Sequence, residues 1–365
     1  MNNKIKNKIV CVLFAVFLIL GFTLGSFMPK AEFSASERRK LAKKPVLNSE
    51  NILSGKYMTD FEKYTVDTFP FRDNWREIKA LWAKNVFLNK DNNGVYLHDN
   101  YLAAMDYPYN PASVDRAVSR FQFVIDKYLN ENNNVYVSII PDKNYFLAEP
   151  SGHLSYDYDE LVEQFVNGMS GTKYIDVFDK LSIEDYYLTD THWKQDKIVP
   201  VAQTLLEGMG IEFENNFEVK ETEKPFYGVY YGQAALPVEP DELNYLVNGK
   251  IEDYTVFDYQ NNKEIPMYNL DKVTDKDPYE MFVGGPISLV TITNENAETD
   301  KELIVFRDSF GSSIAPLLSS GYSKVTLVDI RYLQPERLGS FIDFENSDVL
   351  FLYSSFVINN SEILK

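Results

Sequence analysis

A serine at a sharp turn is the first candidate for chemistry in this chain. Ser309 follows the apolar run 303–306, which is typical of a short strand buried on both faces. Residues 314–318 predict a helix, and Gly321 closes it. A serine between a buried strand and a helix has its hydroxyl lifted clear of the sheet, where the N–H groups of the helix start can hold a developing oxyanion. Ser309 is therefore a candidate nucleophile, with simple helix capping by Asp308 and Ser309 as the alternative.

An aspartate and a histidine two residues apart are the second candidate. In an extended segment alternate side chains point the same way, so Asp190 and His192 can face one cleft. A serine nucleophile needs an imidazole as its base and a carboxylate that orients this imidazole and stabilises the imidazolium. Asp190, His192 and Ser309 together predict a catalytic triad. The alternatives are a surface pair that caps the next helix, predicted over 194–209, and a metal pair, for which no third nitrogen or sulfur ligand is in evidence.

Six further residues are weaker candidates for contacts with a substrate or an oxyanion. Most follow predicted strands, and ligands of α/β sheets bind outside the carboxyl ends of strands. An ion pair is the alternative for Arg331, and an ion pair or a turn is the alternative for Lys143. The six residues are Lys143, Gly285, Asn294, Arg307, Arg331 and Tyr332.

The composition excludes several classes of function. The 365-residue chain has a formal net charge of −18, whereas a phosphate backbone requires a basic surface, so we expect no nucleic-acid partner. Cys11 is the single cysteine, so neither an intramolecular disulfide nor a cysteine metal site can form. With three histidines in the chain we expect no multi-histidine metal centre, and no cofactor is implied.

The beginning of the chain has the pattern of a membrane anchor. Residues 9–28 are apolar and uncharged, about the length that crosses a bilayer, and three lysines precede them. We expect residues 1–8 to stay in the cytoplasm and everything after the anchor to lie outside the cell. A cleaved signal peptide is the alternative.

The rest of the sequence predicts a stalk and one α/β domain. Residues 29–90 should form the stalk and its helices. From residue 91 to 365 helices and buried strands alternate, which is typical of an α/β domain with a mostly parallel sheet. Residues 211–302 break this alternation and predict a β-rich insertion, whose tyrosines and glycines would suit sugar stacking or form a plain aromatic cluster. The stalk also contains an apolar stripe that we expect to pack in a core, made of Trp75, Ile78, Leu81, Trp82 and Val86.

With these motifs assembled, the chain resembles the DHHW proteins, which are related to the alginate O-acetylation proteins AlgJ and AlgX. The resemblance rests on the stretches Asp190-Thr191-His192-Trp193 and Arg307-Asp308-Ser309-Phe310-Gly311. It implies an SGNH-hydrolase-like three-layer domain in which Asp190 orients His192 and His192 activates Ser309. It extends over most of the predicted exterior part, through the segments 36–42, 67–72, 93–96, 141–143 and 329–332.

The resemblance also implies a function. This would be an O-acetyltransferase that modifies a cell-surface or exported polysaccharide through an acetyl-serine intermediate. A multi-spanning membrane acyltransferase would be the partner that supplies the acetyl group. Two alternatives stay open: a carbohydrate acetylesterase with the same triad, and a non-catalytic subunit that binds or assembles the polysaccharide. The presence of Asp190, His192 and Ser309 argues against the non-catalytic subunit.

Overall fold

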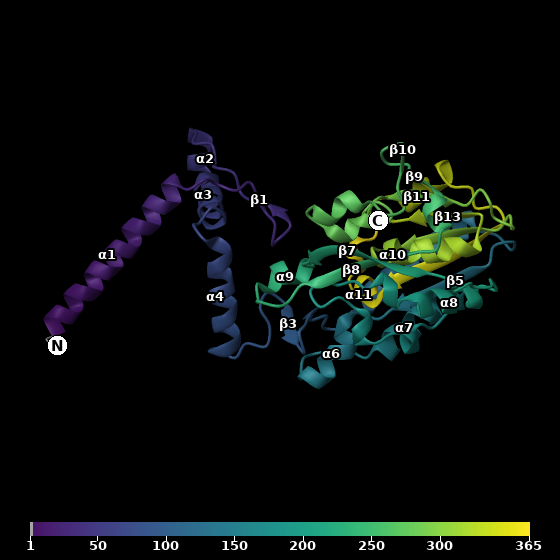
Figure 1. The fold of residues 1–365 in the computed structure, drawn as a ribbon, viewed down its shortest axis with the longest axis horizontal. Coiled ribbons are helices and arrows are strands. Elements are labelled where there is room, and N and C mark those ends of the chain that lie inside the picture. Colours follow the sequence, from purple (N-terminus) through teal and green to yellow (C-terminus); the bar gives the residue numbers. More distant parts are fainter. Residues whose placement is uncertain (1–2) are drawn as a thin grey trace. The chain divides into compact units, whose positions relative to one another are not determined.

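The computed structural model describes residues 3–365, which divide into two compact units (Figure 1). The first unit runs to Asn92 and also contains Tyr231–Pro237. The second unit comprises Asn93–Tyr230 and Val238–Lys365, and it holds every residue of the predicted site.

The first unit is mainly helical. Its α1 has the length and apolar composition of a helix that crosses a membrane, and a signal sequence near the N-terminus fits the same description. A fifth helix, α9 (Val229–Ala234), begins in the second unit and ends in the first. The other elements are α1 (Asn3–Phe27), β1 (Phe33–Ser34), β2 (Arg39–Lys40), α2 (Ser49–Leu53), α3 (Lys56–Asp67) and α4 (Arg72–Asn85).

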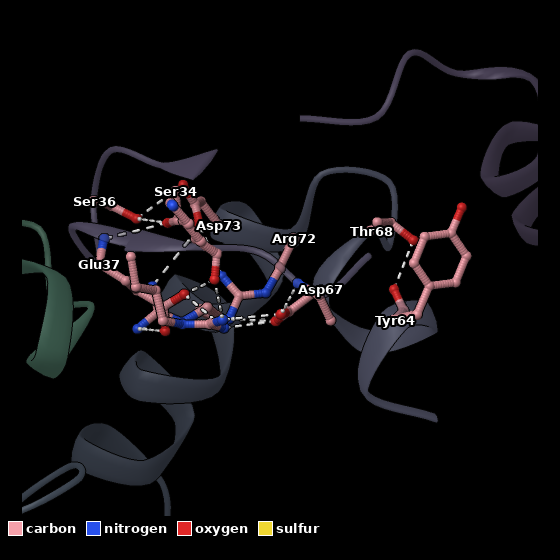
Figure 2. Close-up of polar contacts among 12 residues, drawn as sticks. Ser34, Ser36, Glu37, Tyr64, Asp67, Thr68, Arg72 and Asp73 are labelled. Atoms are coloured by element: carbon pink, nitrogen blue, oxygen red, sulfur yellow. Dashed lines mark hydrogen bonds and ion pairs between the residues drawn. The ribbon is translucent and has the colours of Figure 1, made fainter. Parts of the chain in front are cut away.

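An ion-pair network joins the β1–β2 segment to the junction of α3 and α4 (Figure 2). Asp67, at the end of α3, accepts hydrogen bonds from Arg39 at 2.6 and 2.9 Å and from the N–H of Ala42 at 2.8 Å. The bonds from Arg39 lower the pKa of Asp67 to about 2. Arg72 Nη1 lies 2.6 Å from Glu37, and its Nη2 lies 3.6 Å from Asp67. These charge-assisted contacts hold residues 37–42 against the start of α4.

The second unit is built on an eight-stranded sheet in the order β10-β9-β11-β13-β12-β14-β5-β6. Its helices are α5 (Pro111–Tyr128), α6 (Lys143–Ser151), α7 (Tyr158–Gly168), α8 (Val199–Gly208), α10 (Phe310–Leu318) and α11 (Ser355–Asn359). The strands of the sheet are β5 (Val135–Ile140), β6 (Lys173–Tyr174), β9 (Thr255–Asp258), β10 (Lys263–Ile265), β11 (Leu289–Thr293), β12 (Glu302–Arg307), β13 (Lys324–Val328) and β14 (Ser347–Ser354). Two hairpins lie outside it, β3–β4 (Val95–His98 and Tyr101–Ala104) and β7–β8 (Glu218–Phe226 and Asp241–Val247).

Strand register brings four strand ends to one edge of the sheet. β13, β12, β14, β5 and β6 pair in parallel, with Phe306 opposite Val328, Arg307 opposite Leu352, and Ser354 opposite Ile140. The carboxyl ends of β13, β12, β14 and β5 therefore meet at the same edge. Ligands of α/β sheets bind at this edge.

Helices cover both faces of this sheet. Consecutive residues of β14 point to opposite sides, so Leu350 and Phe351 belong to two different apolar clusters. Phe121 of α5 and Phe165 of α7 lie in the cluster of Phe351, whereas α8 and α10 contribute to that of Leu350. The second unit is thus a three-layer α/β domain with a mostly parallel sheet, as the sequence predicted.

The insertion over 211–302 is rich in strands, but it does not form one separate layer. Its strands β9, β10 and β11 extend the central sheet, and all of their pairings are antiparallel. Only β7 and β8 form a sheet of their own. The alternation of helix and strand is lost here because antiparallel neighbours need no crossover helix.

Candidate functional site

Ser309 lies at the sharp turn between β12 and α10, at the carboxyl edge of the sheet. It occupies the position before the first residue of α10, yet its side chain makes no capping hydrogen bond. The capping role belongs to Asp308, whose Oδ1 accepts from Phe310 N at 3.0 Å. Asp308 Oδ2 accepts from the backbone N–H and the hydroxyl of Ser354, at 2.8 and 2.7 Å, which ties this turn to β14. Ser309 is partly exposed, and its hydroxyl does not cap the helix.

Asp190 and His192 face Ser309 from a tight turn rather than from an extended segment. Tyr187 N donates to His192 O at 3.1 Å, and residues 188–192 bend between these two ends. Asp190 Oδ1 accepts from both the backbone N–H of His192, at 3.1 Å, and its Nδ1, at 2.5 Å. The prediction of an extended segment at Asp190 and His192 is therefore wrong. The two side chains meet because a short aspartate side chain closes a turn on the N–H two residues ahead.

The three side chains form one continuous hydrogen-bonded series. His192 Nε2 lies 2.7 Å from Ser309 Oγ, on the far side of the ring from Asp190. Asp190 is fully buried and His192 nearly so. The other carboxylate oxygen of Asp190 accepts from the N–H of Val229 at 2.9 Å. With Nδ1 facing a carboxylate, Nε2 is placed to accept the proton of the serine hydroxyl, which is the arrangement that nucleophilic acyl transfer requires.

Two buried charges of opposite sign hold the backbone that leads into Asp190. The ammonium of Lys143, at the start of α6, donates to the carbonyls of Tyr187, Leu188 and Asp190 at 2.7, 3.1 and 3.0 Å. Asp241, at the start of β8, accepts from the N–H groups of Leu188 and Thr189 at 2.5 and 2.8 Å, and from the Thr189 hydroxyl at 2.5 Å. The ammonium of Lys143 thus binds carbonyl groups of this irregular segment, and the carboxylate of Asp241 binds its N–H groups. Buried backbone groups without partners would be costly, so the two ions stabilise one conformation of residues 187–190.

Three side chains join this segment to α10 and so set the distance between the imidazole and the serine. Trp193 Nε1 donates to Ser313 Oγ at 2.8 Å, and Gln195 Nε2 donates to Ser313 O at 2.7 Å. The ring of Tyr279 stacks on that of His192 with a centroid separation of 3.8 Å and an interplanar angle of 6°, while its hydroxyl lies 2.8 Å from Ser313 Oγ. The stacked ring of Tyr279 therefore fixes the plane of the imidazole, and hydrogen bonds fix the imidazole at both nitrogens.

The backbone of Gly228 packs directly on Asp190. A Cβ atom at residue 228 would overlap with both the Cα and the Cβ of Asp190. Gly228→Ala should therefore lower the free energy of unfolding by about 1–3 kcal/mol, since the backbone must move to relieve the overlap. Thermal unfolding checks this, with Gly208→Ala as the control, because there the new Cβ meets only the side chain of Ile175, at 2.8 Å. Equal changes in the two variants would contradict the prediction.

Comparison with known proteins gives the fold. The chain matches no family model, and no curated protein matches it. A solved DHHW family protein from Eubacterium siraeum is 20% identical and superposes with a TM-score of 0.57, over 75% of this chain and 95% of that one. The two proteins share their fold. PatB1 from Bacillus cereus, 17% identical, superposes with a TM-score of 0.56 over 72% of this chain and 96% of that one. The O-acetyltransferase domain of Pseudomonas putida AlgJ is also similar, at 14% identity and a TM-score of 0.43, over 73% of this chain and 92% of that one.

Three of the weaker candidates cannot reach a substrate. Lys143 is buried and donates to the three carbonyls named above. Arg307 has no exposed surface and donates to the carbonyls of Gly285 and Ile287, at 3.2 and 3.3 Å. Gly285 is not a free oxyanion donor, because its N–H donates to Phe282 O at 3.0 Å. These three residues hold the loops around the site.

Asn294 lies at the wrong edge of the sheet. It follows β11, which runs antiparallel to β13, so that Thr293 is opposite Lys324 at the start of β13. Its side chain donates to the Tyr254 hydroxyl at 3.1 Å. The prediction of an oxyanion donor at this residue is wrong, because it assumed that the end of each strand lies beside Ser309.

Arg331 and Tyr332 do lie at the edge that carries Ser309, just after β13. The guanidinium of Arg331 is paired with Asp329, with Nε–Oδ1 and Nη2–Oδ2 distances of 2.9 and 2.7 Å. Tyr332 is half exposed. A contact of either residue with a substrate stays a prediction, and the ion-pair alternative for Arg331 is present in the structure.

Three residues that hold the site were not predicted: Asp241, Gly228 and Tyr279. All three come from the insertion over 211–302. Gly228, one of the glycines of this insertion, serves a close backbone approach to Asp190 and not to a sugar. The described residues 3–365 contain no group of three or more His, Cys, Asp or Glu side chains that could hold a metal ion.

Proposed function

We propose that this protein is an O-acetyltransferase that acts outside the cytoplasm on a polysaccharide, with Ser309 as nucleophile, His192 as base and Asp190 as the residue that orients the base. One observation carries the proposal. A partly exposed serine at the carboxyl edge of the sheet is 2.7 Å from an imidazole whose other nitrogen is 2.5 Å from a buried carboxylate. The motifs shared with the DHHW, AlgJ and AlgX proteins support the choice of acetyl transfer.

The reaction would proceed in two halves. Ser309 Oγ attacks the carbonyl carbon of an acetyl donor while His192 Nε2 takes the hydroxyl proton; the bond to the leaving group breaks, and His192 returns the proton to it. The acetyl group is then an ester of Ser309. In the second half a sugar hydroxyl attacks this ester, His192 takes its proton, and the proton passes to Ser309 Oγ as the new ester leaves.

The location and the partners are part of the same proposal. α1 would anchor the chain in the membrane, with the lysines of its first turns in the cytoplasm and the residues after it outside. Acetyl-CoA is absent there, so a multi-spanning membrane acyltransferase would supply the acetyl group, and a polysaccharide would accept it. An acetylesterase would use the same three residues with water as the acceptor.

A covalent probe separates these possibilities. A solved structure of PatB1 carries a sulfonyl adduct, so a sulfonyl fluoride is a suitable reagent for a serine nucleophile. The full chain should be labelled at Ser309 by phenylmethylsulfonyl fluoride, and an aryl acetate should give an acetyl-Ser309 peptide in the mass spectrum. Transfer of the acetyl group to an added sugar oligomer supports the transferase. Release of acetate alone identifies an esterase, and absence of both labels would overturn the catalytic proposal.

Lys143→Met should lower kcat by about 10- to 100-fold, because the segment that carries Asp190 and His192 would shift away from Ser309. Turnover of an aryl acetate measures kcat and KM separately, and kcat should carry the loss. Lys220→Met is the matched control, since Lys220 Nζ lies 3.2 Å from Glu218 at the surface, away from the segment of Asp190. An unchanged kcat in Lys143→Met, or an equal loss in the control, would show that Lys143 does not position the base.

Lys143 should also cause kcat to fall on the alkaline side of its pH profile, which we call the alkaline limb. Burial lowers the pKa of Lys143 to about 7, against the opposing effect of the charges of Asp241 and Asp190. Above this pH a neutral amine has two N–H groups for three carbonyls, so kcat should fall as the pH rises through about 7. Unfolding does not explain such a fall. The unfolded chain binds this proton up to a higher pH than the folded chain, so the contribution of Lys143 to stability rises over that range. The limb should be absent from the pH profile of Lys143→Met, and its persistence there would contradict the assignment.

A further inference from the structure

A helix of the first unit exposes the large apolar side chains that were expected to form a core. Four of the five expected residues are exposed, namely Trp75, Ile78, Trp82 and Val86, whereas Leu81 is half-buried. Together with the exposed Phe71 just before the helix, these four make up what we call the α4 stripe. Trp75 is 45% exposed and Trp82 is 54% exposed. The prediction of a core at this stripe is therefore wrong.

The opposite face of α4 is the one that packs. Ala80 is fully buried and Ala83 nearly so, and Arg76 on the same side donates to Gly232 O. The helix thus buries its small side chains and exposes its tryptophans. A contiguous exposed apolar face of this kind is uncommon in water and marks a surface that binds something.

The start of this stripe lies against the end of the candidate membrane helix. Lys30 Nζ donates to Gly25 O, near the end of α1, and also lies 3.3 Å from Thr68 O. Pro70 lies beside Gly25, at 3.8 Å from the position that a Cβ of Gly25 would take. Both Thr68 and Pro70 belong to the short junction between α3 and α4. If α1 ends at the surface of a bilayer, the stripe begins there too.

The residue types and charges of this region fit the same surface. Tryptophan favours the boundary between lipid headgroups and acyl chains, and helices that lie in this boundary carry tryptophan and phenylalanine on their apolar face. Residues 29–92 carry 13 Lys or Arg and 9 Asp or Glu, whereas the whole chain has 36 and 54. The segment is therefore basic within a strongly acidic protein, and an anionic lipid surface attracts basic segments.

We infer that the α4 stripe binds the surface of the lipid bilayer, with Trp75, Ile78 and Trp82 at the level where headgroups meet acyl chains. α4 is an interfacial helix in this arrangement, held by apolar contact and by attraction of the surrounding basic side chains to anionic lipid. The inference rests on the proposed anchoring of α1 and is independent of the chemistry proposed for Ser309.

The three tryptophans of the chain allow a direct test. Trp75 and Trp82 belong to the stripe, and Trp193 is completely buried in the second unit. The full chain is reconstituted in vesicles of phosphatidylcholine and phosphatidylglycerol, in which part of the lipid carries bromine near the headgroup end of its acyl chains. Tryptophan emission should fall by about twofold, because two of the three fluorophores would lie at the interface. The double variant W75F/W82F should lose this quenching, since only Trp193 remains.

The alternatives give different results with the same samples. Quenching of Trp75 and Trp82 by aqueous acrylamide, without quenching by bromolipid, would show that the stripe faces water and would overturn the inference. Protection from both quenchers would show that protein covers the stripe, from a second copy or another chain, and would overturn it as well. Labelling of Ser309 by a sulfonyl fluoride in these vesicles reports on the proposed function separately, so failure of either proposal leaves the other measurable.

Discussion

Ser309→Ala should reduce acetyl transfer to the background rate, a loss of about 10³-fold or more. The substitution removes only the hydroxyl group. Its oxygen lies 2.7 Å from His192 Nε2, and it makes no capping hydrogen bond with α10. The fold should therefore be unchanged while the covalent step is lost. Release of an aryl group from an activated acetate, together with the mass spectrum of the acetylated chain, measures both the rate and the intermediate.

The matched control for this variant is Ser320→Ala. Ser320 lies just beyond the same helix and donates only to Leu317 O, at 2.8 Å, so its loss should leave turnover unchanged. Both variants should unfold at the temperature of the wild type. If Ser309→Ala retained acetyl transfer at the wild-type rate, the nucleophile would have to be another group. If the wild type were as inert as Ser309→Ala towards donor, acceptor and sulfonyl fluoride, the non-catalytic alternative would replace the enzyme.

Asp190→Asn should lower kcat by about 10⁴-fold without a comparable change in KM. Asp190 accepts three hydrogen bonds, two from His192 through Oδ1 and one from Val229 N through Oδ2. An asparagine has one acceptor oxygen, so in either orientation its NH₂ group faces an N–H donor. His192 can relieve this conflict by moving its proton from Nδ1 to Nε2. The ring would then donate to Ser309 and could no longer accept its proton.

A surface control and the rate of sulfonyl labelling distinguish this effect from a loss of structure. Asp179→Asn removes a carboxylate that pairs with Lys180 at the surface, and it should leave kcat unchanged. Sulfonyl labelling of Ser309 in Asp190→Asn should slow in parallel with turnover, because both reactions need the base. Labelling at the wild-type rate in Asp190→Asn would show that His192 still activates the serine, and Asp190 would then have no part in orienting it.

The turn that carries Ser309 was predictable because its determinants are local. A strand buried on both faces must be apolar at every residue, which makes the run 303–306 conspicuous, and the helix after it has its own period. The same reasoning places Lys143 and Arg331 after buried strands, at the edge where Ser309 lies. The ion pair of Arg331 with Asp329 was one of the two alternatives from the sequence. The role of Lys143 was not predictable, since its partners are carbonyls of residues 187–190, far along the chain.

The sequence by itself determined the α/β class, the turn that presents Ser309, and the residue types able to perform acyl transfer. Only the tertiary structure decided which residues reach the serine, and the reason is strand direction and burial. The antiparallel pairing of β11 removes Asn294 to the far edge, because antiparallel neighbours put their carboxyl ends at opposite sides of a sheet. Complete burial turns Arg307 and Lys143 from candidate substrate contacts into supports of the loops. The tryptophans of α4 have the spacing of core residues, yet they are exposed because the helix packs through its alanines. Which face of a helix packs depends on the neighbouring elements, and the periodic pattern of one helix does not contain this information.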